Sequence, residues 1–365
     1  MERNRKKIKF YSLKRIKEIH AQYNMIIGER SNGKTYSVLS EIVDNYFKTG
    51  KQGAIVRRWQ DDFKGKRALT MFAPLVADNL IYKLSGAQWD RIDYRSGCWY
   101  PARYDEDTDT IVRGDKPIAY AFSLSSMEHD KSTSYPEITT ICFDEFLTRG
   151  YYLVDEFVLF MNVISTIVRQ RTDVTIYMLG NTVNWSCPYF TEMGIKHIKD
   201  MKQGSIDVYE YGESGLKVAV EYCQSIADSK QSNVYFAFDN PRLQMITTGA
   251  WEIALYPHLP VKYKPKDIKG IFFIIFEGDT LQCEVIKIKS NAFIYIHRKS
   301  TPIHDYDNDM IFQINNDYRI NHYQSLVRPR DKRSNVIAFL IKQNKVYYQD
   351  NEVGEIVRNY RQSTD

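Results

Sequence analysis

The residues with the clearest chemical pattern lie near the start of the chain, in the stretch GERSNGKT. An apolar run ending at Ile27 precedes this stretch, and apolar residues at helical spacing follow it. A glycine-rich loop between a strand and a helix can turn its backbone N–H groups toward phosphate oxygens, and the helix start adds partial positive charge. A simple glycine-rich turn is the alternative. The context favours a phosphate-binding loop made by Gly28, Arg30, Ser31, Asn32, Gly33, Lys34 and Thr35.

Two adjacent carboxylates offer the second half of a hydrolytic site. Asp144 and Glu145 follow an apolar, β-rich run over residues 138–143, and ligands of open α/β sheets bind beyond the C-terminal ends of strands. In such a site Lys34 reaches the β- and γ-phosphates, and the Thr35 hydroxyl and Asp144 hold Mg²⁺. Glu145 polarises the attacking water. The alternative is that the acidic pair merely caps a helix after the strand.

The acidic pair also narrows the class of nucleotide enzyme. GTPases typically have Asp-x-x-Gly at the end of the acidic strand, where this sequence has Asp-Glu-Phe-Leu, and the sequence contains no Asn-Lys-x-Asp motif for guanine. Small-molecule kinases usually lack a Glu directly after the metal-binding Asp. The pattern therefore favours an ATPase of the ASCE type, with ATP and Mg²⁺ as cofactors. In that branch an extra strand lies between the phosphate-loop strand and the strand that carries the metal-binding acid.

Further polar residues follow the neighbouring predicted elements. Asn181 ends an apolar strand that begins near residue 173, where it could sense the γ-phosphate or simply occupy a turn. A helix predicted over 155–170 ends with Arg169 and Arg171. An arginine there could reach the site of a neighbouring subunit, as arginine fingers do, or only interact with the helix dipole.

A second arginine pair follows a predicted strand that begins near Ala54. We expect Arg57 and Arg58 to be a solvated strand end; contact with DNA or with a neighbouring subunit is the alternative.

The composition sets outer limits on the protein. Its 365 residues allow two domains, 43% hydrophobic residues allow a large core, and the net charge is +5. Basic residues gather in the first twenty positions and again over 328–333, as nucleic-acid contacts or as solvated surface. Five widely spaced cysteines predict reduced thiols and no zinc site. We expect neither a membrane span nor a signal peptide, because no apolar run is long enough and the basic start lacks a hydrophobic core.

The pattern changes after about residue 210. We expect a P-loop ATPase domain with a mostly parallel sheet over 1–210, a connector of helix and loop over 211–260, and a smaller α/β domain over 261–365. The last domain opens on three strands with tight turns, as an RNase H-like module does. A nuclease of that fold needs clustered carboxylates for two metal ions. The first strand has none, so we expect no nuclease activity and a vestigial domain that grips DNA, RNA or the portal.

Taken together, these motifs resemble the DNA-encapsidation ATPases of small podovirus-like bacteriophages, a terminase-like P-loop family. The resemblance rests on an arginine at the third loop position, on GAIVRR, on a Lys-Ser-x-x-Tyr-Pro segment before the acidic pair, and on IVRQR and GNT after it. It is clearest over residues 20–190. The loop departs from the family at Ser31, where glycine is common, so the backbone must still curl there.

The resemblance implies a homopentameric ring that drives double-stranded DNA into a procapsid at its portal vertex. By motif position, Lys131 and Arg169 act in the adjacent subunit's nucleotide site, with Arg171 as an alternative to Arg169. The expected location is the host bacterial cytoplasm, transiently at the portal. The requirement for a structural RNA stays open. The alternative functions are a cellular or plasmid ATPase that moves nucleic acid and a nucleotide-regulated ring component with little turnover.

Overall fold

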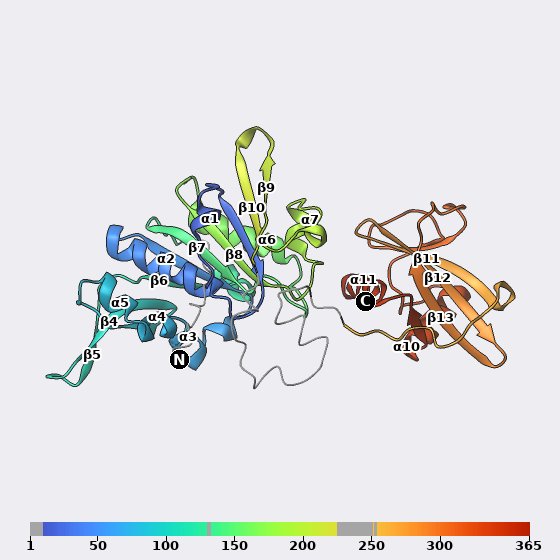
Figure 1. Ribbon diagram of the computed structural model, residues 1–365, viewed down its shortest axis with the longest axis horizontal. Helices are drawn as coiled ribbons and strands as arrows, with labels where there is room; N and C mark the ends of the chain where they lie inside the picture. The colour runs from blue at the N-terminus through green and yellow to red at the C-terminus, as the bar shows by residue number, and fades with distance from the viewer. Residues whose placement is uncertain (1–9, 130–132, 225–250, 252–253) are drawn as a thin grey trace, which may run out of the picture. The chain divides into compact units, whose positions relative to one another are not determined.

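The computed structural model describes residues 10–129, 133–224, 251 and 254–365. The chain divides into two compact units, residues 1–252 and 253–365, and each is described by itself (Figure 1). No helix in the described ranges is both long and apolar enough to cross a membrane.

The first unit is built on a ten-stranded sheet in the order β3-β4-β6-β2-β7-β8-β1-β10-β9, with β5 paired to β4. Its strands are β1 (Tyr23–Gly28), β2 (Gln52–Arg57), β3 (Arg91–Arg95), β4 (Cys98–Asp105), β5 (Thr110–Arg113), β6 (Ala119–Ser123), β7 (Ile138–Asp144), β8 (Thr175–Asn181), β9 (Ile206–Tyr211) and β10 (Leu216–Tyr222). The six strands from β6 to β10 in this order run parallel. Strand β8 lies between β1 and β7, which confirms the predicted extra strand.

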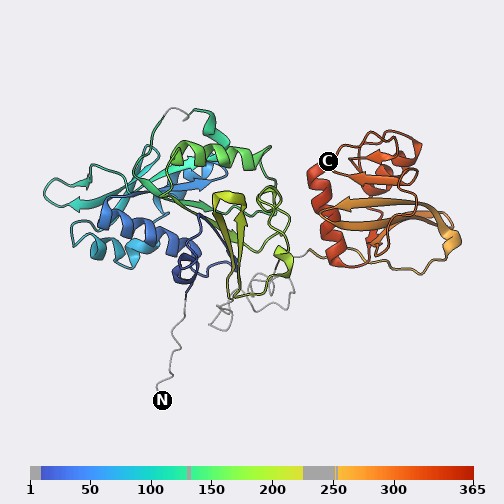
Figure 2. The ribbon, with the colours of Figure 1, turned by 90° about the horizontal axis from the view of Figure 1, so that it is seen from above.

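Helices cover both faces of this sheet (Figure 2). They are α1 (Lys14–Lys17), α2 (Lys34–Thr49), α3 (Gly65–Leu69), α4 (Ala73–Ala77), α5 (Leu80–Leu84), α6 (Glu156–Val168) and α7 (Pro188–Glu192), with short 3₁₀ turns at Gln60–Phe63, Leu124–His129, Ile198–Asp200 and Gly212–Ser214. Helix α2 buries Leu39, Ile42 and Val43 against one face. On the other, Phe160 of α6 packs on Phe143, with ring centroids 4.8 Å apart. Because side chains alternate along a strand, β7 fills both layers.

The prediction that residues 211–260 form a connector of helix and loop is partly wrong. Residues 206–222 form the hairpin β9–β10, and β10 pairs in parallel with β1 from Tyr23 to Ile27. The first unit's sheet therefore extends past residue 210. The remainder of the expected connector, from 225 to 250, lies outside the described residues.

The second unit has a six-stranded sheet in the order β15-β14-β11-β12-β13-β16. Its elements are β11 (Ile268–Phe276), β12 (Asp279–Ile288), β13 (Asn291–Arg298), β14 (Met310–Gln313), β15 (His322–Tyr323), α10 (Lys332–Lys342), β16 (Val346–Tyr348) and α11 (Asn351–Thr364), with a 3₁₀ turn at Pro265–Asp267. Strands β11 to β13 form an antiparallel meander, and β14 and β15 continue the sheet in parallel on the other side of β11. The meander confirms the three predicted strands with tight turns. The likeness of this unit to RNase H stays a prediction.

Two helices complete the second unit, and each starts at an aspartate cap. The Asp331 and Asp350 carboxylates accept hydrogen bonds from the backbone N–H groups of Ser334 and Val353, both at 2.8 Å. Helix α11 buries Val353, Ile356 and Tyr360 in the core of the unit.

Candidate nucleotide site

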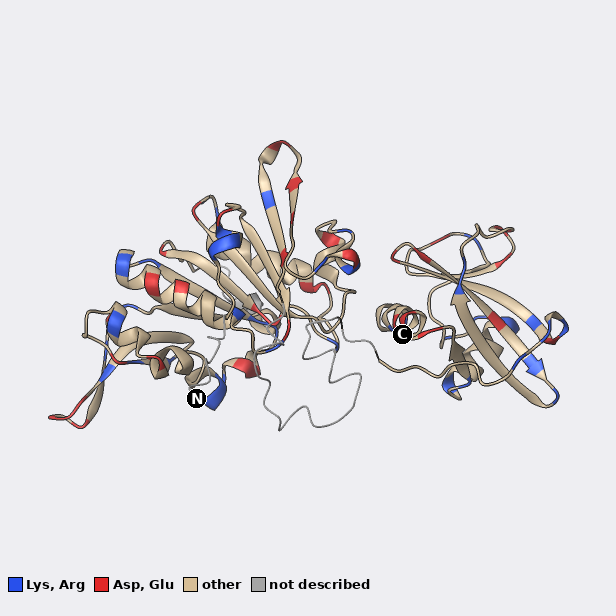
Figure 3. Cartoon of the chain, viewed as in Figure 1, with Lys and Arg blue, Asp and Glu red and all other residues tan. Residues whose placement is uncertain are grey.

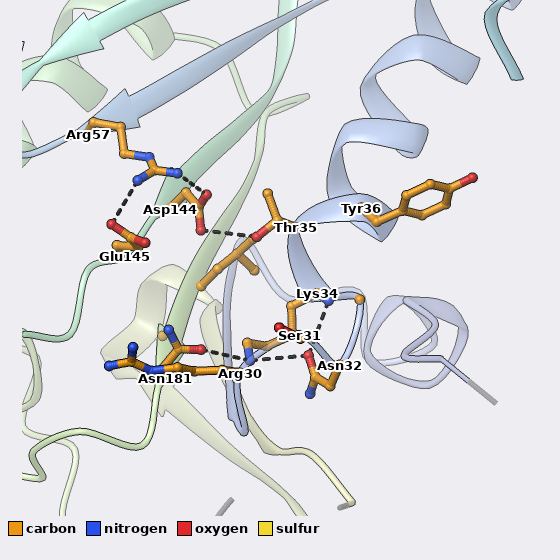
Figure 4. A pocket seen from close by; sticks show the side chains of 13 residues that line it. Arg30, Ser31, Asn32, Lys34, Thr35, Tyr36, Arg57, Asp144, Glu145 and Asn181 are labelled. Carbon is orange, nitrogen blue, oxygen red and sulfur yellow. Dashed lines mark hydrogen bonds and ion pairs between the residues drawn. The ribbon is translucent and has the colours of Figure 1, made fainter. Parts of the chain in front are cut away.

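The polar residues predicted for the site meet at one edge of the first sheet. Strands β1, β2, β7 and β8 are parallel, so Gly28, Arg57, Asp144 and Asn181 all lie at carboxyl ends of strands on that edge. A cavity of about 470 Å³ opens there. Its lining is Arg30, Ser31, Asn32, Gly33, Lys34, Thr35, Tyr36, Arg57, Asp144, Glu145, Leu179, Gly180 and Asn181 (Figure 4).

The loop between β1 and α2 curls as a phosphate-binding loop requires. Ser31 has φ of 59° and Gly33 has φ of 96°, so both adopt the left-handed conformation. Serine takes this conformation at some cost where glycine would not. The Gly28 backbone passes so close to Cys223 that a Cβ added at Gly28 would lie 2.8 Å from the Cys223 Cβ. Because Ser31 itself adopts the left-handed conformation, its departure from the family pattern leaves the curl of the loop in place.

Lys34 is buried at the start of α2 and bonds to oxygens around it. Its Nζ donates to the carbonyl of Glu29 at 2.6 Å and to the Oδ1 atoms of Asn32 and Asn181 at 3.2 and 3.3 Å. Burial lowers the pKa of Lys34 to about 8. The structure thus joins the phosphate-loop lysine to Asn181 at the end of β8.

Thr35 and Asp144 lie together as a hard-cation site would need. The Thr35 Oγ1 donates to Asp144 Oδ1 at 3.2 Å. Hydroxyl and carboxylate oxygens are the ligands that Mg²⁺ prefers, so the residues present fit this ion. Glu145 follows with φ of 64°. That backbone conformation turns the chain sharply after β7, and the Glu145 carboxylate also borders the cavity.

The expectation that Arg57 and Arg58 form a solvated strand end is wrong. The Arg57 guanidinium lies 2.5 Å from Asp144 Oδ2 and 2.8 Å from Glu145 Oε2, with only 16% of its side chain exposed. Burial lowers the pKa of Arg57, but the two carboxylates outweigh it and raise the pKa above its usual value. Arg57 is a site residue that sequence reasoning missed; the available signal was its place at the end of a strand beside the acidic one.

Arg58 points away from the cavity and anchors the chain that follows Glu145. Its guanidinium forms two bonds with the buried Glu156 carboxylate, at 2.7 and 2.8 Å, and donates to the carbonyl of Phe146 at 2.8 Å. Tyr189 donates to the same carboxylate at 2.8 Å. This buried network fixes the start of α6 relative to the end of β2.

The two arginines after α6 have different surroundings. Arg171 donates to the carbonyls of Pro136, Ile138 and Ile167 at 2.9, 2.6 and 3.0 Å. Arg169 is exposed, and its Nη2 donates to the Thr133 carbonyl at 3.1 Å. Neither borders the nucleotide cavity of its own chain. Lys131, expected to act beside Arg169, lies outside the described residues.

The geometry is that of a P-loop nucleotide site, and comparison with known proteins places the chain. The family model described as podovirus DNA encapsidation protein (Gp16) matches residues 107–338, which is more than half of the sequence. The chain belongs to this DNA encapsidation family. Its fold and its order of motifs agree with the expected resemblance.

Two relatives and one solved structure share 20–28% sequence identity with this chain. The DNA packaging protein of Bacillus phage PZA is 22% identical over 281 residues, which cover 74% of each protein. The DNA packaging protein of Bacillus phage B103 is 28% identical over 177 residues, and this match spans 47% of the present chain and about half (48%) of that relative. The structure of the Phi-28 gp11 DNA packaging motor aligns with a TM-score of 0.54 at 20% identity, over 98% of this chain and 99% of that one. At this identity the likeness establishes the fold.

The carboxylates of the second unit are engaged in local contacts. Asp279 pairs with Arg298 at 2.7 Å, and Asp307 pairs with Arg319 at 2.8 Å. Within the ranges that the structure describes, no group of three or more His, Cys, Asp or Glu side chains is placed to hold a metal ion. The absence of nuclease activity stays a prediction.

Proposed function

We propose that this chain is an ATP-driven motor that moves double-stranded DNA into a phage procapsid. The observation that carries the proposal is the convergence of Lys34, Thr35, Asp144 and Glu145 on one cavity. Membership of the encapsidation family supports viral DNA as the cargo. The motor would act in the host cytoplasm, as a ring at the portal vertex of the procapsid. Five copies are the expected number, and a structural RNA is a further candidate partner.

The chain's own residues divide the work of hydrolysis. Lys34 exchanges its bonds to loop oxygens for bonds to the β- and γ-phosphates. Thr35 and Asp144 hold Mg²⁺, which when bound neutralises charge on the phosphates. Glu145 orients and polarises the attacking water once Arg57 releases its carboxylate. Asn181, bonded to Lys34, is placed to respond to loss of the γ-phosphate.

A neighbouring copy would complete each site. Two arginines line the cavity, and one of them, Arg57, is already shared between two carboxylates. Arg169 is exposed on another part of the unit, so it can reach a second copy, whereas Arg171 is committed to carbonyls of its own chain. We assign Arg169 the role of stabilising transition-state charge in the adjacent site, with Lys131 as a second donated cation.

Mixing inactive variants tests the shared site. We would measure ATP turnover with and without double-stranded DNA for Arg169→Ala, for Glu145→Gln and for their mixture. Each variant alone should lose most of its turnover while still binding ATP. The mixture should recover part of it, because some interfaces combine an intact Glu145 with an intact Arg169.

The matched control mixes Lys34→Ala with Glu145→Gln. Both defects lie on the same side of the interface, so each site lacks one group and no recovery is expected. Failure of the first mixture to recover, or full activity of Arg169→Ala alone, would contradict the shared site. Turnover that does not respond to DNA at any salt concentration would instead contradict the motor, since phosphate contacts dominate sequence-independent DNA binding.

A further inference from the structure

A short loop of the second unit exposes two large apolar side chains to an unusual degree. The loop spans residues 314–320, between β14 and β15, and Tyr318 and Ile320 are 95% and 92% exposed. Tyrosine at the centre of a protein interface contributes much of the binding energy. We call this loop, together with residues 305–309, which include three aspartates, the acidic knob.

The acidic knob is held in place by a central arginine. Arg319 pairs with Asp307 at 2.8 Å and with Asp317 at 2.7 Å, and its guanidinium lies 4.6 Å from the centre of the Tyr306 ring. These contacts order the loop before any partner arrives. A preorganised loop loses little further conformational entropy on binding, so Tyr318 is well suited to be an anchor.

The charge of the acidic knob indicates the chemistry of its partner. Residues 300–321 contain four Asp, one Arg and no Lys. This surface repels the phosphates of DNA and RNA, whose binding depends on basic residues. The partner is therefore a protein surface that is apolar at its centre and basic at its edges.

The same unit carries a surface of that kind on α10. Val336 and Phe339 are 51% and 60% exposed on the outer side of this helix. Lys332 lies on the same helical face, and Arg333 and Lys342 flank it on either side, because residues three, four and seven apart share a face. Residues 328–345 contain six Lys or Arg and one acid. We call this surface the basic helix face.

The apolar side chains of both surfaces stay exposed in the second unit, so the two surfaces do not cover each other within one copy. Figure 3 shows acidic residues on the loops at the top of the second unit and basic residues lower down on it. An acidic, apolar surface and a basic, apolar surface that are both exposed on one unit match a second copy of this chain.

We propose that the acidic knob of one copy docks on the basic helix face of the next, with Tyr318 and Ile320 against Val336 and Phe339. The contact joins two different surfaces, so it links copies head to tail and closes into a ring if the rotation permits. It deepens the proposed ring by assigning the second unit a structural role in it. The contact is independent of the nucleotide site and can fail separately.

Pairwise cross-linking of the full-length chain tests this contact. Four of the five native cysteines are buried and Cys98 is partly exposed, so the background is Cys98→Ser. Tyr318→Cys and Phe339→Cys chains are oxidised alone and as a mixture. We expect disulfide-linked dimers in the mixture and few in either variant alone. A chain with both substitutions should give a ladder of higher oligomers.

The control replaces Tyr318→Cys with Ile271→Cys, which is exposed on β11 outside both surfaces. It should give no dimer with Phe339→Cys. The proposal is overturned if the Tyr318→Cys mixture forms no dimer at any protein concentration, or if either single variant dimerises equally well alone. It is also overturned if Phe339→Ala weakens DNA binding and leaves self-association unchanged.

Sedimentation gives a second, independent readout. Tyr318→Ala combined with Ile320→Ala should weaken self-association at least tenfold while ATP binding by the first unit stays unchanged. If cross-linking fails and the Arg169 and Glu145 variants still complement each other, the ring exists without this contact. If the reverse holds, the contact exists and the shared nucleotide site is wrong.

Discussion

Arg57 bridges the two carboxylates that follow β7, with Nη2 at 2.5 Å from Asp144 Oδ2 and Nη1 at 2.8 Å from Glu145 Oε2. One guanidinium therefore pairs with both the acid proposed to hold Mg²⁺ and the acid proposed to activate water, and its single positive charge is shared between them. The Asp144 side chain is only 8% exposed, whereas 62% of the Glu145 side chain is exposed. The pair with Asp144 should therefore contribute most to stability.

Replacing Arg57 should make the stability of the folded protein more dependent on Mg²⁺. Arg57→Ala leaves the buried Asp144 carboxylate without its cation, and we expect a loss of about 3 kcal/mol in the free energy of unfolding. Excess Mg²⁺ can supply the missing positive charge. The melting temperature of Arg57→Ala should therefore rise more with Mg²⁺ than that of the wild type, with Arg57→Lys intermediate. Equal shifts for all three proteins would show that Arg57 and a metal do not share this site.

In alkaline solution, ATP binding should be accompanied by uptake of a proton by Lys34. Burial lowers the pKa of Lys34 to about 8, so the lysine is charged below this pH and increasingly neutral above it. Phosphate oxygens favour the charged form, and binding must therefore protonate Lys34 at higher pH. Calorimetry in buffers of different ionisation enthalpy should detect no proton uptake well below pH 8 and up to about one proton per site above it. ATP affinity should fall over the same range.

The same pKa makes a prediction for stability. The folded state holds Lys34 with a lowered pKa, so its burial opposes folding fully at neutral pH, and this penalty is relieved as pH rises above about 8. Lys34→Met should therefore flatten this part of the stability–pH profile. A profile that is identical for wild type and Lys34→Met would contradict the burial of a charged lysine.

Substitution of Arg169 should reduce catalysis without loss of stability, whereas substitution of Arg171 should reduce stability. Arg171→Ala removes the donor to three carbonyls near the start of β7 and the end of α6, so we expect a loss of about 1–3 kcal/mol in the free energy of unfolding. Arg169→Ala should change stability by less than about 0.5 kcal/mol, because its side chain is exposed. Urea denaturation with turnover assays distinguishes them. A stable but inactive Arg171→Ala would reassign the trans-acting role to Arg171.

The Arg58–Glu156 pair should show strong coupling. Both side chains are buried, so Glu156→Ala leaves an uncompensated charge and should cost about 3–5 kcal/mol. The double variant with Arg58→Met and Glu156→Met should lose much less free energy of unfolding than the sum of the losses in the two single variants. A double-mutant cycle by chemical denaturation measures this coupling. Additive effects would mean that the two side chains act independently.

Local patterns in the sequence were sufficient for the central part of the site. The phosphate loop, the strand ending at Asp144 and the strand ending at Asn181 all depend on short apolar runs bounded by glycine or polar residues. Parallel strands then bring their carboxyl ends to one edge. This is why the sequence predicts that Lys34, Thr35, Glu145 and Asn181 lie together.

Other features depend on partners that are distant in the chain. Arg57 and Arg58 are adjacent and identical in type, yet one faces Asp144 and Glu145 and the other faces Glu156. Alternation along the strand sends them to opposite sides, but only the neighbouring strand and helix supply the carboxylates that bury them. Residues 216–222 likewise become a strand because β1 offers an open edge for parallel pairing.

The sequence by itself therefore determined the nucleotide chemistry of this protein, since that chemistry needs particular residue types at short fixed spacing. Only the tertiary structure decided which charged residues are paired, which are buried and which remain exposed. Pairing and burial are set by contacts between segments tens to hundreds of residues apart, and no local pattern encodes them.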